Sequence, residues 1–245
     1  MTTLPLILYF ALQLLNTPYG SHLLDKTSTE QLVTRTDSLD CFTLVETALA
    51  QALAHQQHTT DTQHFAPQLQ QLRYRHGQVA YQNRLHYFSE WILVNQQRHI
   101  IKEIQAPQSL FTQTLRKDIN YMSTHPQLYP QLKAHPEWIP IIRQHEQEIN
   151  QQQIRYIPKS KIHNNYQLRN IIRDGDIIAI VTDIPGLDIS HVGIAIWQDN
   201  QLHLLHASSI HGKVIIDTKP LSQYLNQHPK QLGIRIIRPT YPPES

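Results

Sequence analysis

The stretch DIIAIV at residues 176–181 is the clearest β-strand signal in this 245-residue chain, because Asp176 is followed by five apolar residues, four of them β-branched. Further strands are predicted at residues 191–197, 202–207, 214–217 and 233–237. Short polar links join them, and residues 198–201 and 211–212 are typical of hairpin turns. The last third of the chain therefore predicts an antiparallel sheet.

Upstream of this sheet the chain reads as mostly helical. Helical spacing is found at residues 43–53, at residues 65–75 and from Ile141 onward. Residues 100–101 suggest a short strand, and residues 110–123 are ambiguous between strand and helix. A polar run at residues 55–63 predicts a loop, and residues 220–226 predict a short helix. Helices followed by an antiparallel sheet predict an α+β domain, and the length fits one domain enlarged by insertions.

The first apolar segment, residues 4–15, has two interpretations. It resembles the apolar core of a signal peptide, but basic residues do not precede it and no A-x-A cleavage site follows. It is also too short to cross a membrane as a helix. We therefore expect a buried helix that ends at the turn of residues 16–20. The residues on its apolar stripe are Leu4, Ile7, Leu8, Ala11, Leu14 and Leu15.

Composition excludes several classes of protein. The net charge is +2 with scattered basic residues, which is unlike a nucleic-acid-binding surface or a polybasic membrane patch. A single cysteine excludes a disulfide within the chain. With 7 glycines the chain contains neither GxGxxG nor GxxxxGK[ST], so no phosphate-binding loop is indicated.

The lone cysteine lies at the predicted start of a helix, in LDCFTLVE at residues 39–46. Asp40 is a good N-cap, and the apolar spacing that follows is helical. A thiol in the first turn lies near unpaired backbone N–H groups and the positive end of the helix dipole, so we expect Cys41 to favour the nucleophilic thiolate. The alternative is a small buried side chain, as free cysteines often are.

Two histidines lie in strands far downstream and complete a pattern typical of thiol hydrolases. Side chains alternate between the faces of a strand, so His191 and His206 can be neighbours on adjacent strands while His203 points to the opposite face. We expect His191 to take the thiol proton of Cys41 and later protonate the leaving amine, and His206 to orient His191.

An oxyanion site is also expected at this helix start. The backbone N–H of Cys41 can donate to the developing oxyanion. Tyr19 lies in a turn between two helices, where its phenol is a candidate second donor or, equally, a packing side chain.

Several motifs occur in an order that resembles the NlpC-type cell-wall cysteine hydrolases, a papain-like superfamily, and within it the N-acetylmuramoyl-L-alanine amidase-like branch. The superfamily motifs are Thr17-Pro18-Tyr19, Asp40-Cys41, Asp174-Gly175-Asp176, Ser190 to Ile194 and His206-Ala207-Ser208. The branch is indicated by Asp40 to Glu46, Arg84 to Trp91, Gly186 to His191 and Gly233 to Pro239. The resemblance runs from the first helix to Pro239 and is weakest over residues 59–68 and 125–153.

This resemblance implies a papain-like NlpC-type fold, with N-terminal helices packed on a C-terminal antiparallel sheet. It implies a single cysteine-hydrolase domain at residues 1–245 with a family-specific helical insertion at about residues 59–153. The implied substrates are peptidoglycan-derived muropeptides, cut between N-acetylmuramic acid, favoured in its 1,6-anhydro form, and L-alanine. By the same resemblance Cys41, His191 and His206 form the triad beside Tyr19, without metal or cofactor. The implied location is periplasmic or exported, with the cytoplasm as the alternative.

Five further residues are candidates for substrate binding. Arg84, His86 and Tyr87 lie in the segment that distinguishes this branch, and arginine with aromatic side chains suits a glycan and its carboxylates. The alternative is a helix that packs its aromatic side chains into the core. Asp188 and Ser190 precede His191 and either line the groove or shape the turn.

Three rival functions stay open. A zinc amidase built on the histidines is one, although HExxH is absent. The second is a non-catalytic wall-binding module, and the third is a γ-D-glutamyl–diamino-acid endopeptidase that uses the same nucleophile.

Overall fold

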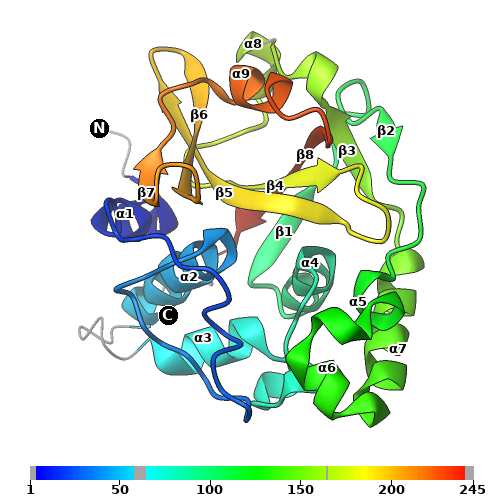
Figure 1. Cartoon of the computed structure of the whole chain (residues 1–245). Helices are drawn as coiled ribbons and strands as arrows, with labels where there is room; N and C mark the ends of the chain where they lie inside the picture. The colour runs from blue at the N-terminus through cyan, green and yellow to red at the C-terminus, as the bar shows by residue number, and fades with distance from the viewer. Residues whose placement is uncertain (1–3, 58–64, 164, 241–245) are drawn as a thin grey trace.

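A computed structural model describes residues 4–57, 65–163 and 165–240, and within them eight strands form one antiparallel sheet (Figure 1). The sheet order is β2-β3-β8-β4-β5-β6-β7, and β1 also pairs with β8. The strands are β1 (Ile101–Ile104), β2 (Gln113–Thr114), β3 (Arg155–Pro158), β4 (Ile177–Thr182), β5 (Ile189–Gln198), β6 (Gln201–Ser208), β7 (Lys213–Ile216) and β8 (Gln231–Pro239). The predicted α+β class with an antiparallel sheet is confirmed.

Strand β4 is apolar on both faces because both faces of the sheet are covered. Ile177, Ala179 and Val181 pack into a cluster with the N-terminal helices, whereas Ile178 and Ile180 pack into a second cluster on the opposite face. A strand covered on both sides has no solvent-facing positions, so it reads as a continuous apolar run. Burial of each isoleucine or valine side chain of β4 stabilises the fold by roughly 1.5–3 kcal/mol.

The hairpin that joins β5 to β6 sets the register of the two strands that carry the histidines. Asp199 and Asn200 have φ angles of 47° and 60°, a left-handed conformation that Asp and Asn tolerate well in two-residue hairpin turns. The register pairs Gln198 with Gln201 and Ile194 with Leu205. The predicted turn at residues 198–201 is confirmed.

One face of the sheet is covered by helices from the first hundred residues (Figure 1). They are α1 (Leu6–Gln13), α2 (Cys41–Gln56), α3 (Ala66–Arg73) and α4 (Phe88–Gln97). Helix α1 packs against α2, and α2 packs against β5 and β6. The expected burial of the first helix is confirmed at Ile7, Leu8, Ala11 and Leu14, whereas Leu4 is exposed because α1 begins after it.

A group of short helices packs against α4 at the lower right of Figure 1. It comprises α5 (Tyr121–Thr124), η4 (Pro126–Leu128), α6 (Pro130–Ala134), η5 (Pro136–Trp138) and α7 (Ile139–Asn150). Proline stands in the first turn of the last four of these, where its missing N–H leaves no helical bond unmade. The predicted helix from Ile141 is confirmed, and it begins two residues earlier.

The opposite face of the sheet is covered near α8 (Asn165–Arg169) and α9 (Leu221–Asn226). Three further turns of 3-10 helix, η2 (Arg75–Gly77), η3 (Tyr81–Asn83) and η6 (Lys159–Lys161), lie in the connections. The ambiguous residues 110–123 contain both β2 and the start of α5. Most of the loop predicted at residues 55–63 lies outside the described residues. Among the described helices, none has the length and hydropathy needed to cross a membrane.

Candidate active site

Helix α2 begins at Cys41, as predicted, and its start is fixed by a capping box. The Asp40 carboxylate accepts the backbone N–H of Thr43 at 2.7 Å, and the Thr43 hydroxyl accepts the backbone N–H of Asp40 at 2.9 Å. These reciprocal bonds satisfy N–H groups that a helix start leaves unpaired. They hold the cysteine in the first turn.

The electrostatics of the thiol differ from the expectation. Burial raises the pKa of Cys41 to about 12, and the neighbouring Asp40 carboxylate raises it further. The backbone N–H groups of Val192, Cys41 and Phe42 lower the pKa but do not outweigh burial. The expected preference for thiolate is therefore wrong, because the helix start contributes only partial charges while the half-buried sulfur loses its hydration. The resting form is the neutral thiol.

The sulfur of Cys41 nevertheless lies against the strand that carries the predicted base. Helix α2 packs on β5, and the backbone N–H of Val192 lies close enough to the sulfur to lower the pKa of the thiol. Val192 directly follows His191 in that strand. The fold thus brings together two motifs that are 150 residues apart in sequence.

His191 and His206 are direct neighbours. Nε2 of His191 lies 2.7 Å from Nδ1 of His206, and the planes of the two rings are 89° apart. His203 lies on the other side of β6, where its Nδ1 is 2.9 Å from the backbone oxygen of Asp217. The geometric prediction, that His206 and not His203 reaches His191, is confirmed.

Both imidazoles favour the neutral form. Burial lowers the pKa of His191 to about 3, assisted by the nearby His206 and His228. Burial lowers the pKa of His206 to about 4, although the carboxylate of Asp217 acts in the opposite direction. The thiol of Cys41 and the imidazole of His191 are therefore both neutral, and a neutral imidazole can accept a proton.

Two side chains at this site were not found from the sequence. Oδ2 of Asp217 lies 3.5 Å from Nε2 of His206, and the ring of Tyr224 on α9 stacks 6.2 Å from the ring of His191. A signal for Asp217 exists: Ile215 pairs with His206, and Asp217 lies two residues further on the same side of the chain. For Tyr224 the sequence has no comparable signal.

Tyr19 lies beside the cysteine. Its backbone forms a bridge with Leu39, two residues before Cys41. The pKa of Tyr19 is raised by burial, then by Cys41 and by Asp40, so the phenol keeps its proton and can donate it in a hydrogen bond.

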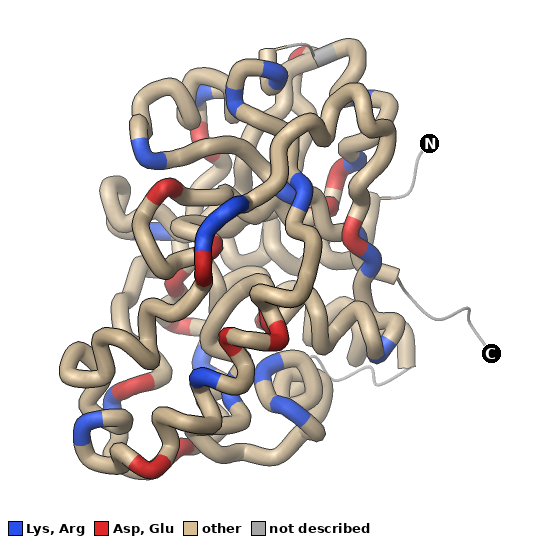
Figure 2. Tube along the Cα trace, turned by 90° about the vertical axis from the view of Figure 1, so that its right-hand side faces the viewer, with Lys and Arg blue, Asp and Glu red and all other residues tan. Residues whose placement is uncertain are grey.

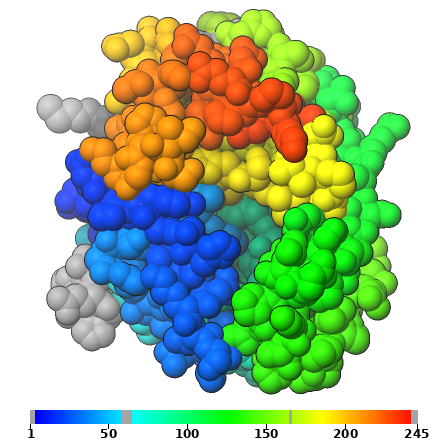
Figure 3. Space-filling view, in the orientation of Figure 1, coloured from blue at the N-terminus to red at the C-terminus, as the bar shows by residue number. Residues whose placement is uncertain are grey.

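A cavity of about 260 Å³ opens next to the residues that flank Cys41, where Figure 3 shows a hollow between the blue N-terminal segment and the green helices. Asp40 and Phe42, which flank Cys41, line this cavity. Its other walls come from residues 22–25, residues 84–87, and the side chains of Glu46, Arg73, Met122, Tyr129 and Leu187. The lining is mixed apolar and polar, as ligand cavities commonly are.

Three of the five predicted binding residues line this cavity, but their polar groups are already engaged. Arg84 is 5% exposed and donates to the backbone oxygen of Leu24 and to the carboxylates of Asp25 and Glu30. Nε2 of His86 is 2.8 Å from the backbone oxygen of Tyr81.

The Tyr87 hydroxyl, the third of these groups, donates to Glu146 at 2.7 Å and accepts the backbone N–H of Met122 at 2.7 Å. Arg84, His86 and Tyr87 therefore shape the cavity wall, and any contact with substrate through them stays a prediction.

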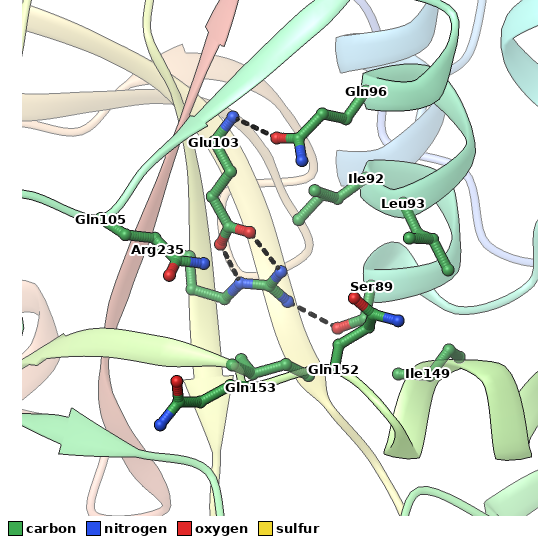
Figure 4. A pocket seen from close by; sticks show the side chains of 11 residues that line it. Ser89, Ile92, Leu93, Gln96, Glu103, Gln105, Ile149, Gln152, Gln153 and Arg235 are labelled. Carbon is green, nitrogen blue, oxygen red and sulfur yellow. Dashed lines mark hydrogen bonds and ion pairs between the residues drawn. The ribbon is translucent and has the colours of Figure 1, made fainter.

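Asp188 and Ser190 do not line the cavity. The buried Asp188 carboxylate accepts the backbone N–H of Ser89 in the first turn of α4, at 2.7 Å. The Ser89 hydroxyl in turn accepts a bond from Arg235, which pairs with Glu103 (Figure 4). This favours the structural alternative for Asp188. Ser190 is exposed on the strand, and its role as a binding residue stays untested.

Charges elsewhere are mixed in sign. Figure 2 shows acidic and basic residues interspersed on the face that it presents, in keeping with the net charge of +2. Across residues 4–57, 65–163 and 165–240, no group of three or more His, Cys, Asp or Glu side chains is arranged to bind a metal ion.

Comparisons with known proteins find solved structures of the same fold. An N-acetylmuramoyl-L-alanine amidase from Bacteroides uniformis is 39% identical with a TM-score of 0.87, and the match covers 96% of this chain and 97% of that one. A Bacteroides fragilis protein, described as a candidate xylanase, is 40% identical with a TM-score of 0.85, over 94% and 99% of the two chains. A Legionella pneumophila protein is 26% identical with a TM-score of 0.70, over 97% and 89%.

Among curated proteins none matches the chain. The N-acetylmuramoyl-L-alanine amidase-like family matches it over residues 9–234, which is most of its length. The family supports a hydrolase of amide bonds whose substrates are related to peptidoglycan. The chain therefore belongs to the N-acetylmuramoyl-L-alanine amidase-like family.

Proposed function

We propose that this protein is a cysteine amidase that cuts the amide between N-acetylmuramic acid and L-alanine in peptidoglycan fragments, with the 1,6-anhydro sugar as its preferred form. The observation that carries the proposal is the placement of Cys41. The backbone N–H of Val192, the residue after His191, lies close enough to lower the pKa of the Cys41 thiol, and His191 is in turn hydrogen-bonded to His206. An NlpC-type, papain-like ancestry fits this order of nucleophile, base and orienting residue.

In the proposed reaction, the neutral pair begins the chemistry by proton transfer. Nε2 of His191 is occupied by His206, so Nδ1 is the nitrogen left to accept the thiol proton. The sulfur of Cys41 then attacks the lactyl carbonyl carbon and forms a tetrahedral intermediate. The amide C–N bond breaks, the nitrogen of L-alanine takes the proton from His191, and a thioester remains. Water, deprotonated by His191, hydrolyses the thioester and regenerates the thiol.

The developing oxyanion has two candidate donors. The backbone N–H of Cys41 lies in the first turn of α2, where no helical acceptor is available to it. The phenol of Tyr19 keeps its proton and is close enough for Cys41 to influence its pKa. Each donor of this kind contributes about 3 kcal/mol to catalysis in other hydrolases.

The cavity beside Cys41 is the proposed position of the muramyl group. Its apolar lining residues Phe42, Met122 and Tyr129 suit the face of a sugar ring, and its lining also includes the polar residues Asp25 and His86. The substrate class also favours a periplasmic or exported location, because peptidoglycan fragments arise there.

The decisive experiment uses defined muramyl tripeptides, with and without the anhydro ring, and mass analysis of the products. We expect free N-acetylmuramic acid, or its 1,6-anhydro form, and an intact tripeptide. A muramyl dipeptide plus a free diamino acid would instead establish a γ-D-glutamyl endopeptidase. Full alkylation of Cys41, and the substitution Cys41→Ala, are expected to abolish turnover. A non-catalytic binding module would keep its affinity for muramyl peptides after either change.

The single cysteine makes the alkylation unambiguous. Cys41→Ala treated with the same reagent is the matched control and should gain no mass. Activity that survives complete modification of Cys41 but is lost with a chelator would replace this proposal with a zinc amidase.

A further inference from the structure

A buried carboxylate continues the row of side chains that starts at the nucleophile. Asp217 follows β7, and its backbone N–H bonds the oxygen of Leu204, which anchors it to β6. Its Oδ1 accepts the backbone N–H of Lys219 at 2.8 Å, while Oδ2 lies 3.5 Å from Nε2 of His206. The side chains of His206 and Asp217 are only 2% and 8% exposed. The two carboxylate oxygens therefore have separate partners.

Two neutral tautomer arrangements satisfy the bond between the histidines. In the first, Nε2–H of His191 donates to Nδ1 of His206, and His206 carries its hydrogen on Nε2. In the second, Nδ1–H of His206 donates to Nε2 of His191, and His191 carries its hydrogen on Nδ1. Only the first leaves a lone pair on Nδ1 of His191, so only the first allows this nitrogen to take the thiol proton.

The carboxylate distinguishes these arrangements. In the first, Nε2–H of His206 lies 3.5 Å from Oδ2 of Asp217, a separation longer than a normal hydrogen bond at which the N–H dipole and the carboxylate still attract each other. In the second, the bare lone pair of Nε2 faces the carboxylate oxygen, and two acceptors repel in a buried site with weak screening.

We propose that Asp217 is a positioning residue that selects, through His206, the tautomer of His191 able to accept the Cys41 proton. This inference rests on the proposed cysteine amidase function. It adds Asp217 to Cys41, His191 and His206 as a fourth residue, one that acts on His191 through His206 without touching the substrate. The same carboxylate also favours the positive charge that His191 carries while it holds the proton.

The bonding of Asp217 makes Asp217→Asn a sharp test. Because Oδ1 is held by Lys219, the amide oxygen of asparagine is expected to keep that position, which places the NH₂ group at the position of Oδ2. This donor faces Nε2 of His206 and enforces the second, unproductive tautomer. We expect kcat to fall about 10–100-fold, the range typical of lost outer-shell partners, with KM unchanged.

Asp217→Ala is the companion variant. This variant removes the carboxylate without enforcing either tautomer, so its kcat should exceed that of Asp217→Asn. It also loses the hydrogen bond that Asp217 accepts from the backbone N–H of Lys219, so it should unfold more readily than Asp217→Asn. Asp199→Asn makes the same chemical change in the exposed β5–β6 turn and should leave kcat unaltered.

Nitrogen-15 NMR of the free protein decides the inference without substrate. In the wild type we expect both histidines to carry hydrogen on Nε2, and in Asp217→Asn on Nδ1, with His191→Gln and His206→Gln supplying the assignments. Unchanged tautomers in folded Asp217→Asn would overturn the inference. Absence of wild-type turnover on every muramyl peptide would instead overturn the proposed function, while the NMR result would still stand.

Discussion

Nε2 of His191 and Nδ1 of His206 are 2.7 Å apart although the two residues are not direct partners in the β5–β6 ladder. The register pairs Ile194 with Leu205, and its continuation places Gly193 opposite His206. A Cβ on Gly193 would lie 2.7 Å from Cγ of Leu204 and 2.8 Å from the oxygen of Leu205. The glycine thus permits the close approach of the strands across which the two imidazoles meet diagonally.

The first prediction compares the two histidines of β6. His206→Ala should lower kcat about 10–100-fold, because His191 loses the partner that fixes its ring. His203→Ala should leave kcat nearly unchanged, since its ring bonds the backbone of Asp217 on the other face. Steady-state kinetics with a muramyl tripeptide, with thermal melts to correct for folding, provide the measurement. Equal losses of kcat in the two variants would contradict the assigned roles.

The second prediction concerns the pH dependence of thiol reactivity. With the pKa of Cys41 at about 12 and that of His191 at about 3, thiol and imidazole are both neutral over the intervening range. The rate of iodoacetamide alkylation should therefore be low at pH 7 and rise steadily through pH 10 without a plateau.

The urea-unfolded chain serves as the control for that experiment. There the thiol regains an ordinary pKa of about 8.5, and the alkylation rate should level off above it. A rate in the folded protein that is already constant near pH 5 would reveal a thiolate–imidazolium pair and refute the neutral resting state.

Much of this site could be predicted from local rules. Asp40 is an N-cap by residue type, and strand periodicity alone separates His206 from His203. The pKa of Cys41 could not be predicted, because it depends on burial by α2 and β5, which are distant in sequence. Asp217 required the register of β7 on β6 as well as the strand assignment.

Outside the site, too, features that depend on contacts between distant segments could not be predicted from the sequence. Strand β3 was not predicted because it is four residues long, ends in Pro158 and is defined by pairing with the distant β8. Asp188 looked like a groove residue by its nearness to His191, yet its carboxylate turns inward to Ser89. Sequence neighbourhood indicates which residues are near each other but not the direction of a side chain outside regular structure.

The third prediction concerns the buried ion pair of Glu46 and Arg73. Nε of Arg73 donates to Oε2 of Glu46 at 2.8 Å, and both side chains are 2% exposed. Glu46→Ala leaves a buried guanidinium without its counter-ion and should lower the free energy of unfolding by about 3–5 kcal/mol. Urea denaturation measures this loss.

The controls for this pair use its own partner and an exposed pair. Glu46→Leu combined with Arg73→Leu removes both charges, so it should destabilise less than Glu46→Ala alone. Asp37→Asn breaks the exposed pair with Arg35 and should change stability little. If the double variant loses as much free energy of unfolding as Glu46→Leu and Arg73→Leu lose separately and in sum, the two side chains do not interact.

The fourth prediction concerns Arg84, which anchors the segment of residues 22–30 over the cavity. Its guanidinium donates to the oxygen of Leu24 and to the carboxylates of Asp25 and Glu30. Arg84→Lys keeps the charge but cannot make all these bonds at once. Loss of one charge-assisted bond, about 2 kcal/mol, should make local opening of this segment roughly 30-fold more frequent.

Trypsin provides the readout, because the exposed Lys26 lies inside that segment. Cleavage after Lys26 should accelerate in Arg84→Lys in proportion to the population in which this segment is open. The KM for the muramyl tripeptide should rise because the cavity wall loosens. The kcat should change little, because Cys41 and His191 keep their positions. Arg169→Lys, which alters an exposed arginine stacked on Trp197, is the matched control and should leave both readouts unaltered. Unchanged cleavage with reduced kcat would instead indicate that Arg84 acts on the reacting groups.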